Sequence, residues 1–347
     1  QEVLSELPGL RQAEAGEFTR RAFDNGKLDL TEVEGLSDLL AAETEIQRRA
    51  AIDQAGGHLR SLYESWMKRL THARAMLEAE FDFADEEDVP GSVSDTIWPD
   101  LHKLMAEISE HMQGVKWGET IRDGFRVALV GAPNVGKSTL LNRLADREVA
   151  IVSEQAGTTR DALEVRLDIG GHLVRVFDTA GLRDTADSIE LEGIRRSISL
   201  AKGADLVLLL EDNTAAPIPA SMIPADMNGA TLRVATKSDL GELHSEREQV
   251  RISARTGAGI PDLIGMISAE LSRRSAVVEG LPNRTRHEAL LRECISRIES
   301  AVAARQIGPE LAANELHAAA DALGRITGRV GVEDLLGVIF SQFCIGK

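Results

Sequence analysis

The stretch VALVGAPNVGKSTLLNRL, residues 127–144, decides the fold of this 347-residue chain. Gly131 and the run Gly136-Lys137-Ser138 have the spacing of a phosphate-binding P-loop, with an apolar strand before them and an amphipathic helix after them. Glycines let the backbone curl so that successive N–H groups point at phosphate oxygens, and the helix N-terminus adds partial positive charge. We expect Lys137 to reach the β- and γ-phosphates of a nucleotide and Ser138 to hold Mg²⁺, because a chance match would lack this context.

Two motifs that follow the P-loop occur in the order typical of a nucleotide-dependent switch. In VRVFDTAG, residues 174–181, Asp178 ends an apolar strand and would support the Mg²⁺ through its shell, while Gly181 can present a backbone N–H near the γ-phosphate. In the intervening AGTTRD loop, Thr159 would supply a second metal-coordinating hydroxyl. Each motif alone is an ordinary turn, but the set in this order indicates a switch.

The motif ATKSD, residues 235–239, predicts the identity of the base. The Asp239 carboxylate can accept hydrogen bonds from both N1–H and the exocyclic amine of guanine, a pair of donors that adenine lacks. Lys237 would lie along the ring. The loop that completes the base pocket is predicted at Ser253, Ala254 and Arg255. Thr236 stands where this motif usually has Asn, so a hydroxyl is kept and an amide is lost; we expect guanine preference to survive.

Composition sets the remaining bounds. The length favours two or three domains, and the formal net charge of −17 disfavours strong nucleic-acid binding by this chain alone. No apolar run is long enough to span a bilayer, and no signal peptide is visible. Two distant cysteines do not form a disulfide framework, so we expect a reducing, cytoplasmic setting without membrane attachment.

Hydrophobic periodicity divides the chain into three segments. The first, up to about residue 119, is predicted to be mostly helical, with one helix face formed by Leu59, Leu62, Trp66, Leu70 and Ala73. The middle segment carries five short apolar runs that predict strands: 125–131, 172–178, 204–210, 231–236 and 249–254. Their alternation with helical stretches predicts a mostly parallel sheet with crossover helices.

The last segment is predicted to be helical again. Its apolar stripe consists of Leu291, Ile295, Ile298 and Val302, and Cys294 lies beside it as a small buried residue rather than a catalytic thiol. Helices on both sides of an α/β segment predict one helical domain built from both ends of the chain.

Together these motifs resemble the MnmE (TrmE) family of tRNA-modification GTPases. The resemblance runs over nearly the whole chain and includes GEFTRRAFDNGKLDLTEVEGLSDLLAAET at 16–44, AIVSEQAGTTRD at 150–161 and the terminal FCIGK at 343–347. Leu182 follows the DTAG motif, where Ras-type switches use a glutamine to orient the attacking water, and a hydrophobic residue there is shared by the Era, EngA, FeoB and MnmE families.

The resemblance implies an α/β P-loop GTPase domain inserted into an all-α helical domain. The expected boundaries are a remnant of an N-terminal folate-binding domain at 1–17, a first helical half at 18–120, the G domain at 121–278 and a second helical half at 279–347. The chain begins with Gln1 rather than Met, and we expect most of the folate-binding domain to be missing.

The family also implies a mechanism in which a potassium ion replaces an arginine finger when two G domains pair. The expected potassium ligands, largely through backbone oxygens, are Asn134, Ser153, Gln155 and Thr158. Glu190 matches the family's water-positioning glutamate, although a solvated helix acid explains it equally well from the sequence. Lys137 and Asn134 join Glu190 as the expected catalytic residues.

The full set of residues expected at the nucleotide is Asn134, Val135, Gly136, Lys137, Ser138, Thr139, Ser153, Glu154, Gln155, Ala156, Gly157, Thr158, Thr159, Asp178, Thr179, Ala180, Gly181, Thr236, Lys237, Ser238, Asp239, Ser253, Ala254 and Arg255. The expected cofactors are GTP or GDP, Mg²⁺ and K⁺. The resemblance adds a one-carbon tetrahydrofolate, with Lys27 and Lys347 as candidate folate contacts, and FAD on a partner protein.

That partner would be an MnmG-type flavoprotein, forming a heterotetramer that holds most of the tRNA, and the full-length protein is expected to be a homodimer. Gly346 and Lys347 disfavour a prenylation signal at Cys344, and a structural tail and a catalytic thiol remain open alternatives. The competing function is a GTP-gated ribosome-assembly switch of the Era or EngA type, which has no reason to carry the FCIGK tail. Neither the folate species nor the tRNAs follow from the sequence.

Overall fold

The computed structural model describes residues 8–82, 96–147, 149–151, 164–178, 203–213, 230–241, 250–274, 280–330 and 339, with side chains from 8 to 80 in the first range. The chain forms two compact units. The helical unit contains residues 1–42, 48–122 and 277–347, and the α/β unit contains 43–47 and 123–276. The prediction of an α/β domain inserted into a helical domain built from both chain ends is confirmed. The sequence places the inserted segment at 121–278, and the structure adds the short segment 43–47 to it.

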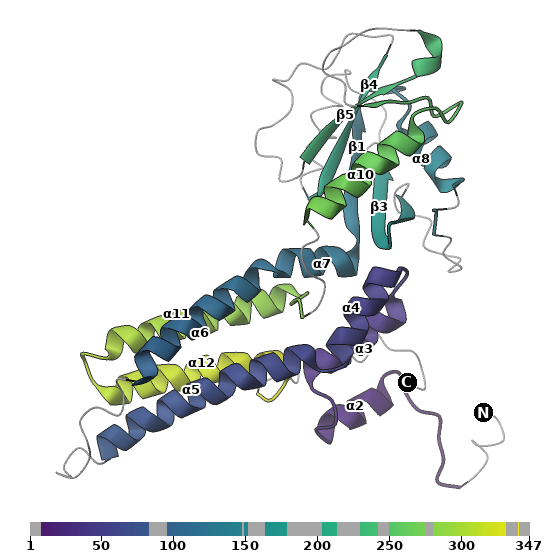
Figure 1. Ribbon diagram of the computed structural model, residues 1–347. Coiled ribbons are helices and arrows are strands. Elements are labelled where there is room, and N and C mark those ends of the chain that lie inside the picture. The colour runs from purple at the N-terminus through teal and green to yellow at the C-terminus, as the bar shows by residue number, and fades with distance from the viewer. Residues whose placement is uncertain are drawn as a thin grey trace. The chain divides into compact units, whose positions relative to one another are not determined.

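The α/β unit is organised around a six-stranded sheet (Figure 1). Its strands are β1 (Phe125–Gly131), β2 (Glu164–Ile169), β3 (His172–Asp178), β4 (Leu206–Asp212), β5 (Ala230–Thr236) and β6 (Val250–Arg251). They are ordered β2-β3-β1-β4-β5-β6, and only the β2–β3 pair is antiparallel. The expectation of a mostly parallel sheet is therefore confirmed.

Strand β2 is the element that the sequence pattern missed. Its sequence EVRLDI carries three charged residues in six, so no apolar run marks it. It lies at the edge of the sheet and forms a hairpin with β3 through the turn at Gly170 and Gly171. Charged residues are common on such strands because an edge faces solvent.

The centre of the sheet places the P-loop. Strand β1 lies between β3 and β4, and its residues Val127 to Val130 are fully buried. Helix α8 (Lys137–Ala145) follows β1, η3 (Ser238–Leu240) follows β5, and α10 (Ile260–Arg274) follows β6. Because chain direction across the sheet reverses at β1, the carboxyl ends of β1, β3 and β4 border the crevice where such sheets bind ligands.

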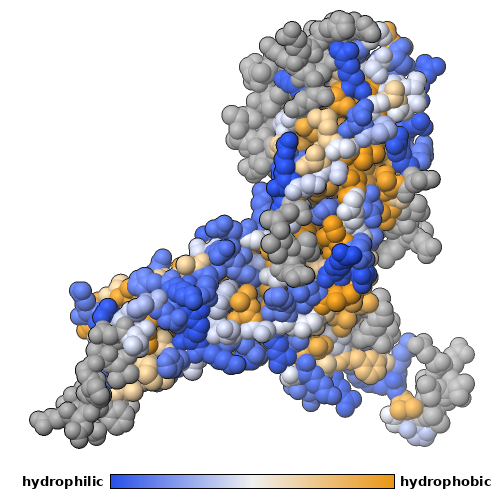
Figure 2. Space-filling view, in the orientation of Figure 1, coloured by the Kyte–Doolittle hydropathy of each residue, from blue (hydrophilic) through white to orange (hydrophobic). Residues whose placement is uncertain are grey.

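The helical unit packs four long helices side by side (Figure 1). These are α5 (His58–Asp82), α6 (Ile97–Gln113), α11 (Thr285–Ala304) and α12 (Pro309–Thr327). The shorter helices are α2 (Glu17–Asp24), α3 (Leu30–Ala41), α4 (Glu45–Ala55) and α7 (Val115–Asp123). On the face drawn in Figure 2, hydrophilic residues cover most of the long helices, as amphipathic helices around a shared core require. No described helix is both long and apolar enough to cross a membrane.

The core of the helical unit corrects two details of the predicted stripes. Tyr63 is fully buried, whereas Leu62 is only partly buried at the margin of the core, because the burial period follows Leu59, Tyr63 and Trp66. Cys294 is fully buried within its stripe, and burial raises the pKa of its thiol to about 12. The thiol therefore stays protonated, as expected for a packing residue.

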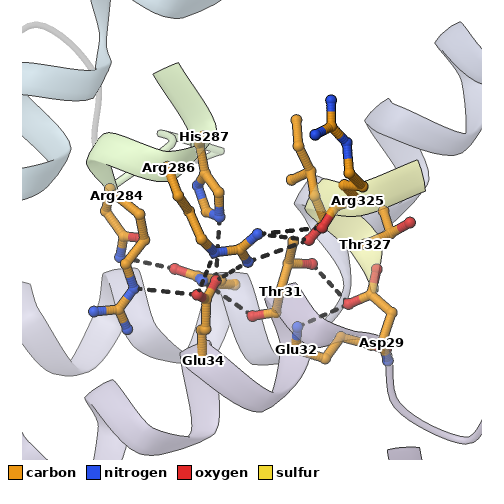
Figure 3. Close-up of polar contacts among 12 residues, drawn as sticks. Asp29, Thr31, Glu32, Glu34, Arg284, Arg286, His287, Arg325 and Thr327 are labelled. Carbon is orange, nitrogen blue, oxygen red and sulfur yellow. Dashed lines mark hydrogen bonds and ion pairs between the residues drawn. The ribbon is translucent and has the colours of Figure 1, made fainter. Parts of the chain in front are cut away.

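A buried polar network joins α3 to the ends of α11 and α12 (Figure 3). The Glu34 carboxylate, on a side chain 4% exposed, accepts hydrogen bonds from Nε and Nη2 of Arg286, each at 2.8 Å, and contacts Nε2 of His287 at 3.1 Å. Nη1 of Arg286 lies 3.2 Å from the carbonyl oxygen of Ile326 near the end of α12. Asp29 and Glu32 form a capping box at the start of α3, which fixes the helix that carries Glu34.

Candidate functional site

The P-loop backbone has the conformation that its sequence predicts. A Cβ atom at Gly131 would lie 2.6 Å from the carbonyl oxygen of Leu210, so only glycine fits where β1 passes β4. Gly136 has φ +109° and Asn134 has φ +59°, both in the left-handed region. Asn tolerates this region better than most residues, and such conformations gather at functional sites. The loop therefore has the left-handed turns that a P-loop sequence rich in glycine and asparagine allows.

Lys137 is the first residue of α8 and lies within the loop. Its side-chain Nζ donates to the carbonyl oxygens of Gly131 and Ala132, each at 2.8 Å, and the residue is 7% exposed. Burial lowers the pKa of the ammonium group, and the Asp178 carboxylate opposes that shift. An ammonium group held at the mouth of a P-loop has one further N–H available for a phosphate oxygen.

Ser138 and Asp178, the two predicted magnesium residues that the structure describes, are brought together. Asp178 ends β3, is 1% exposed and lies opposite Leu129 in the register of β1 and β3. The Ser138 hydroxyl donates to its Oδ2 at 3.0 Å. Mg²⁺ prefers hard oxygen ligands and is held by a hydroxyl and a nearby carboxylate in P-loop proteins, so this pair fits the ion.

The base-reading residues lie at the ends of β5 and β6. The Ser253 hydroxyl donates to Oδ1 of Asp239 at 2.7 Å, and this bond lowers the pKa of the exposed Asp239 carboxyl group. Asp239 therefore remains ionised and can accept two hydrogen bonds. Lys237 has φ +57° and lies beside it. These positions are compatible with a carboxylate that reads guanine.

The Thr236 side chain forms its hydrogen bonds within the protein. Its side chain is 4% exposed, and its hydroxyl lies 2.7 Å from the carbonyl oxygen of Val135 in the P-loop and 3.1 Å from that of Glu211 in β4. Both neighbours are acceptors, so the single hydroxyl proton is used inside the protein. The threonine thus connects the base motif to the phosphate loop.

The remaining described residues of the predicted site lie on the same edge of the sheet. Thr139 lies in the first turn of α8, Ser238 begins η3, and Ala254 and Arg255 follow β6. The other predicted site residues lie outside the described residues: Ser153, Glu154, Gln155, Ala156, Gly157, Thr158, Thr159, Thr179, Ala180, Gly181, Glu190 and Lys347. Leu182 and Cys344 lie outside them too.

One neighbouring group was missed from the sequence. Asp212 ends β4, and its Oδ2 accepts a hydrogen bond from Nζ of Lys237 at 2.6 Å. The sequence feature that could have indicated it is the acidic pair Glu211-Asp212 at the end of an otherwise apolar strand. Lys27, the candidate folate contact, is exposed after α2 in the helical unit.

Known proteins with similar sequences identify the family. The family model of the MnmE helical domain matches residues 30–344. The tRNA modification GTPase MnmE of Rhizobium johnstonii is 52% identical over 346 residues, which cover 99% of this chain and 78% of that protein. The chain belongs to the MnmE family. The tRNA modification GTPase MnmE of Agrobacterium fabrum gives the same identity and coverage.

Among solved structures, the G domain of FeoB from Methanococcus jannaschii is 29% identical and matches 43% of this chain and 98% of its own, with a TM-score of 0.32. The fold itself follows from the strand order and the P-loop described above. Family membership, the P-loop and the base motif together make this protein a GTPase that binds GTP and GDP.

Proposed function

We propose that this chain is a potassium-stimulated GTPase that works with an FAD-dependent MnmG-type partner on the wobble uridine of certain tRNAs. The reaction would add a carboxymethylaminomethyl- or aminomethyl-type group at C5 of the base. The proposal rests on the 52% identity over 99% of the chain to relatives named tRNA modification GTPase MnmE. The nucleotide site described above supports its GTPase part.

The residues of the site divide the work of hydrolysis. Lys137 neutralises negative charge on the β- and γ-phosphates, while Ser138 and Asp178 hold Mg²⁺, which supplies further charge neutralisation. Asn134, exposed and in a left-handed conformation, is the described candidate for a potassium contact. Glu190 is proposed to orient the attacking water, and Ser153, Gln155 and Thr158 to complete the potassium site. Charge stabilisation of this kind acts mainly in the transition state.

The potassium part is tested by steady-state GTP hydrolysis in matched potassium and sodium buffers. Potassium should raise kcat on the order of a hundredfold over sodium, since removal of one group that stabilises developing charge has effects of that size. Several protein concentrations are needed because G-domain pairing should matter. Glu190→Ala should slow turnover while GTP affinity stays nearly the same. Equal rates in both salts would reject the potassium role.

Base specificity is tested by competition between nucleotides. GTP should displace bound GDP, and ATP should not, because Asp239 would be left as an unpaired acceptor opposite adenine. Comparable affinities for ATP and GTP would overturn the guanine assignment and the proposed function with it.

The tRNA part is tested in cells and with the partner. Loss of the gene should remove the modified wobble nucleoside from digested tRNA, and the full-length protein should co-purify with the MnmG-type flavoprotein. Lys27 and Lys347 are proposed to contact a one-carbon tetrahydrofolate held mainly by an N-terminal domain. Unchanged wobble nucleosides together with immature ribosomal subunits would instead favour a GTP-gated ribosome-assembly switch.

A further inference from the structure

The end of strand β4 packs against the base-reading loop at residues 236–241. Strands β4 and β5 are parallel, and Asp212 lies opposite Thr236 in their register. The residue after Asp212 therefore lies beside the loop that follows β5. Asn213 follows Asp212 and is 4% exposed, so the chain is buried at this strand end.

Three hydrogen bonds connect this strand end to the loop. The Asn213 backbone N–H donates to the carbonyl oxygen of Thr236 at 3.1 Å, and its side-chain Nδ2 donates to the carbonyl oxygen of Gly241. Between them, Lys237 donates from Nζ to Oδ2 of Asp212 at 2.6 Å. The loop is thus held at its start, at its end and at the lysine between them.

Lys237 has a conformation that needs such support. Its φ of +57° is unusual for a residue with a Cβ, because the left-handed region brings Cβ close to the backbone. The lysine side chain is 34% exposed and the Asp212 side chain 20% exposed, so the pair is only partly screened by water. A charge-assisted hydrogen bond in this setting fixes both the ammonium group and the four-carbon stem behind it.

We propose that Asp212 is a positioning residue for guanine-nucleotide binding that acts through Lys237. Asp212 fixes the lysine so that its stem is already in place along the purine ring when the nucleotide arrives, and less conformational entropy is lost on binding. The carboxylate itself does not touch the nucleotide. This inference rests on the assignment of the loop as the guanine-reading motif.

The test is a double-mutant cycle on the full chain, with the Kd for GDP as its readout. Asp212→Asn should raise Kd on the order of tenfold, which corresponds to about 1.4 kcal/mol. Asp212→Glu, which keeps the charge, should retain most of the affinity. Asp168→Asn is the matched control: that carboxylate also lies near the end of a strand, in β2, but it accepts from the N–H of Gly171 in the β2–β3 turn, so Kd should stay unchanged.

The second arm separates positioning from a general structural role. In a Lys237→Met background, which keeps an unbranched stem but removes Nζ, Asp212→Asn should have no further effect on Kd. The same tenfold loss in that background, or no loss in the wild-type background, would overturn the proposal. Far-UV circular dichroism melts check folding, and Asp212→Glu keeps the test decisive if Asp212→Asn does not fold.

The outcomes distinguish this inference from the guanine assignment beneath it. A wild-type chain that binds ADP as well as GDP would reject the assignment of the loop. A wild-type chain that prefers GDP, combined with a neutral Asp212→Asn substitution, would reject only the role of Asp212.

Discussion

Each of the two units buries a charged side chain, but the partners of that side chain differ between the units. In the P-loop, Lys137 donates to the carbonyl oxygen of Gly131, six residues away, and to that of Ala132, and both of these acceptors are neutral. In the helical unit, Glu34 is bonded to Arg286, 252 residues away, and their charges neutralise each other. The first arrangement keeps a cation available for an anionic ligand, and the second uses its charges to hold helices together.

This difference predicts which property each unit loses on substitution. Removing the Lys137 ammonium group should weaken nucleotide binding without changing the free energy of unfolding. Removing a member of the Glu34 network should lower the free energy of unfolding without changing nucleotide binding. All three tryptophans, Trp66, Trp98 and Trp117, belong to the helical unit, so tryptophan fluorescence reports on that unit selectively.

The largest expected effect is the loss of nucleotide binding in Lys137→Ala. The ammonium group neutralises phosphate charge, so the Kd for GTP should rise at least roughly a thousandfold, about 4 kcal/mol. Isothermal titration measures this, and unfolding followed by circular dichroism, which reports on both units, should stay the same. GTP binding at wild-type affinity would show that the P-loop assignment is wrong.

Glu34→Ala should give the second largest effect, now on stability. It leaves the partly buried guanidinium of Arg286 and the fully buried His287 without their carboxylate, which costs about 3 kcal/mol of unfolding free energy. Denaturant unfolding followed by tryptophan fluorescence measures this. The control is Glu64→Ala, whose partners Arg60 and Arg329 lie near the surface, and which should cost at most about 1 kcal/mol.

A changed Kd for GDP in Glu34→Ala, with unfolding unchanged, would reverse the comparison between the units. It would mean that the buried network serves the nucleotide site rather than the packing of helices.

The sequence predicted what depends on neighbours along the chain. Strands β1 and β3 lie where their apolar runs placed them, at Phe125–Gly131 and His172–Asp178, because buried strands need such runs. The pairing of Asp212 with Lys237 was not predictable in this way, since the residues are 25 positions apart and meet only through sheet register. The Glu34–Arg286 pair was missed because its residues are 252 positions apart and meet only through the packing of helices.

Side-chain details also required the structure. The sequence placed Leu62 in the core stripe, but a helix with 3.6 residues per turn places Tyr63 there. The Thr236 substitution was visible in the sequence, but its hydrogen bond to the Val135 carbonyl oxygen crosses from one loop to another.

The third expected effect is a loss of stability in acid that originates in the helical unit. Burial lowers the pKa of His111 to about 4, and its Nε2 lies 3.0 Å from the Tyr63 hydroxyl. The unfolded chain therefore binds more protons between pH 6.5 and 4, so this stability is present above pH 6.5 and lost as pH falls. From pH 7 to pH 5 the loss should be about 2 kcal/mol.

Unfolding curves at both pH values measure the loss, and His111→Gln should lose less because it cannot titrate. His287, whose pKa burial also lowers, contributes in the same direction. Glu34 has a lowered pKa, so its contribution is lost only below the usual range of a glutamate and outside this window. Equal losses in wild type and His111→Gln would contradict the role of His111.

The smallest expected effect tests whether the α/β unit also contains a purely internal contact. Thr236→Val removes the hydroxyl that bonds to the Val135 carbonyl oxygen but keeps the side-chain shape, and a lost hydrogen bond of this kind costs about 1 kcal/mol. The Kd for GDP should rise roughly fivefold. Because the hydroxyl supports the phosphate loop rather than the base, the Kd for inosine diphosphate should rise by the same factor, leaving the ratio of the two unchanged. Thr236→Ser, which keeps the donor, should bind both nucleotides like wild type. A ratio that shifts in Thr236→Val would instead assign the threonine to base recognition.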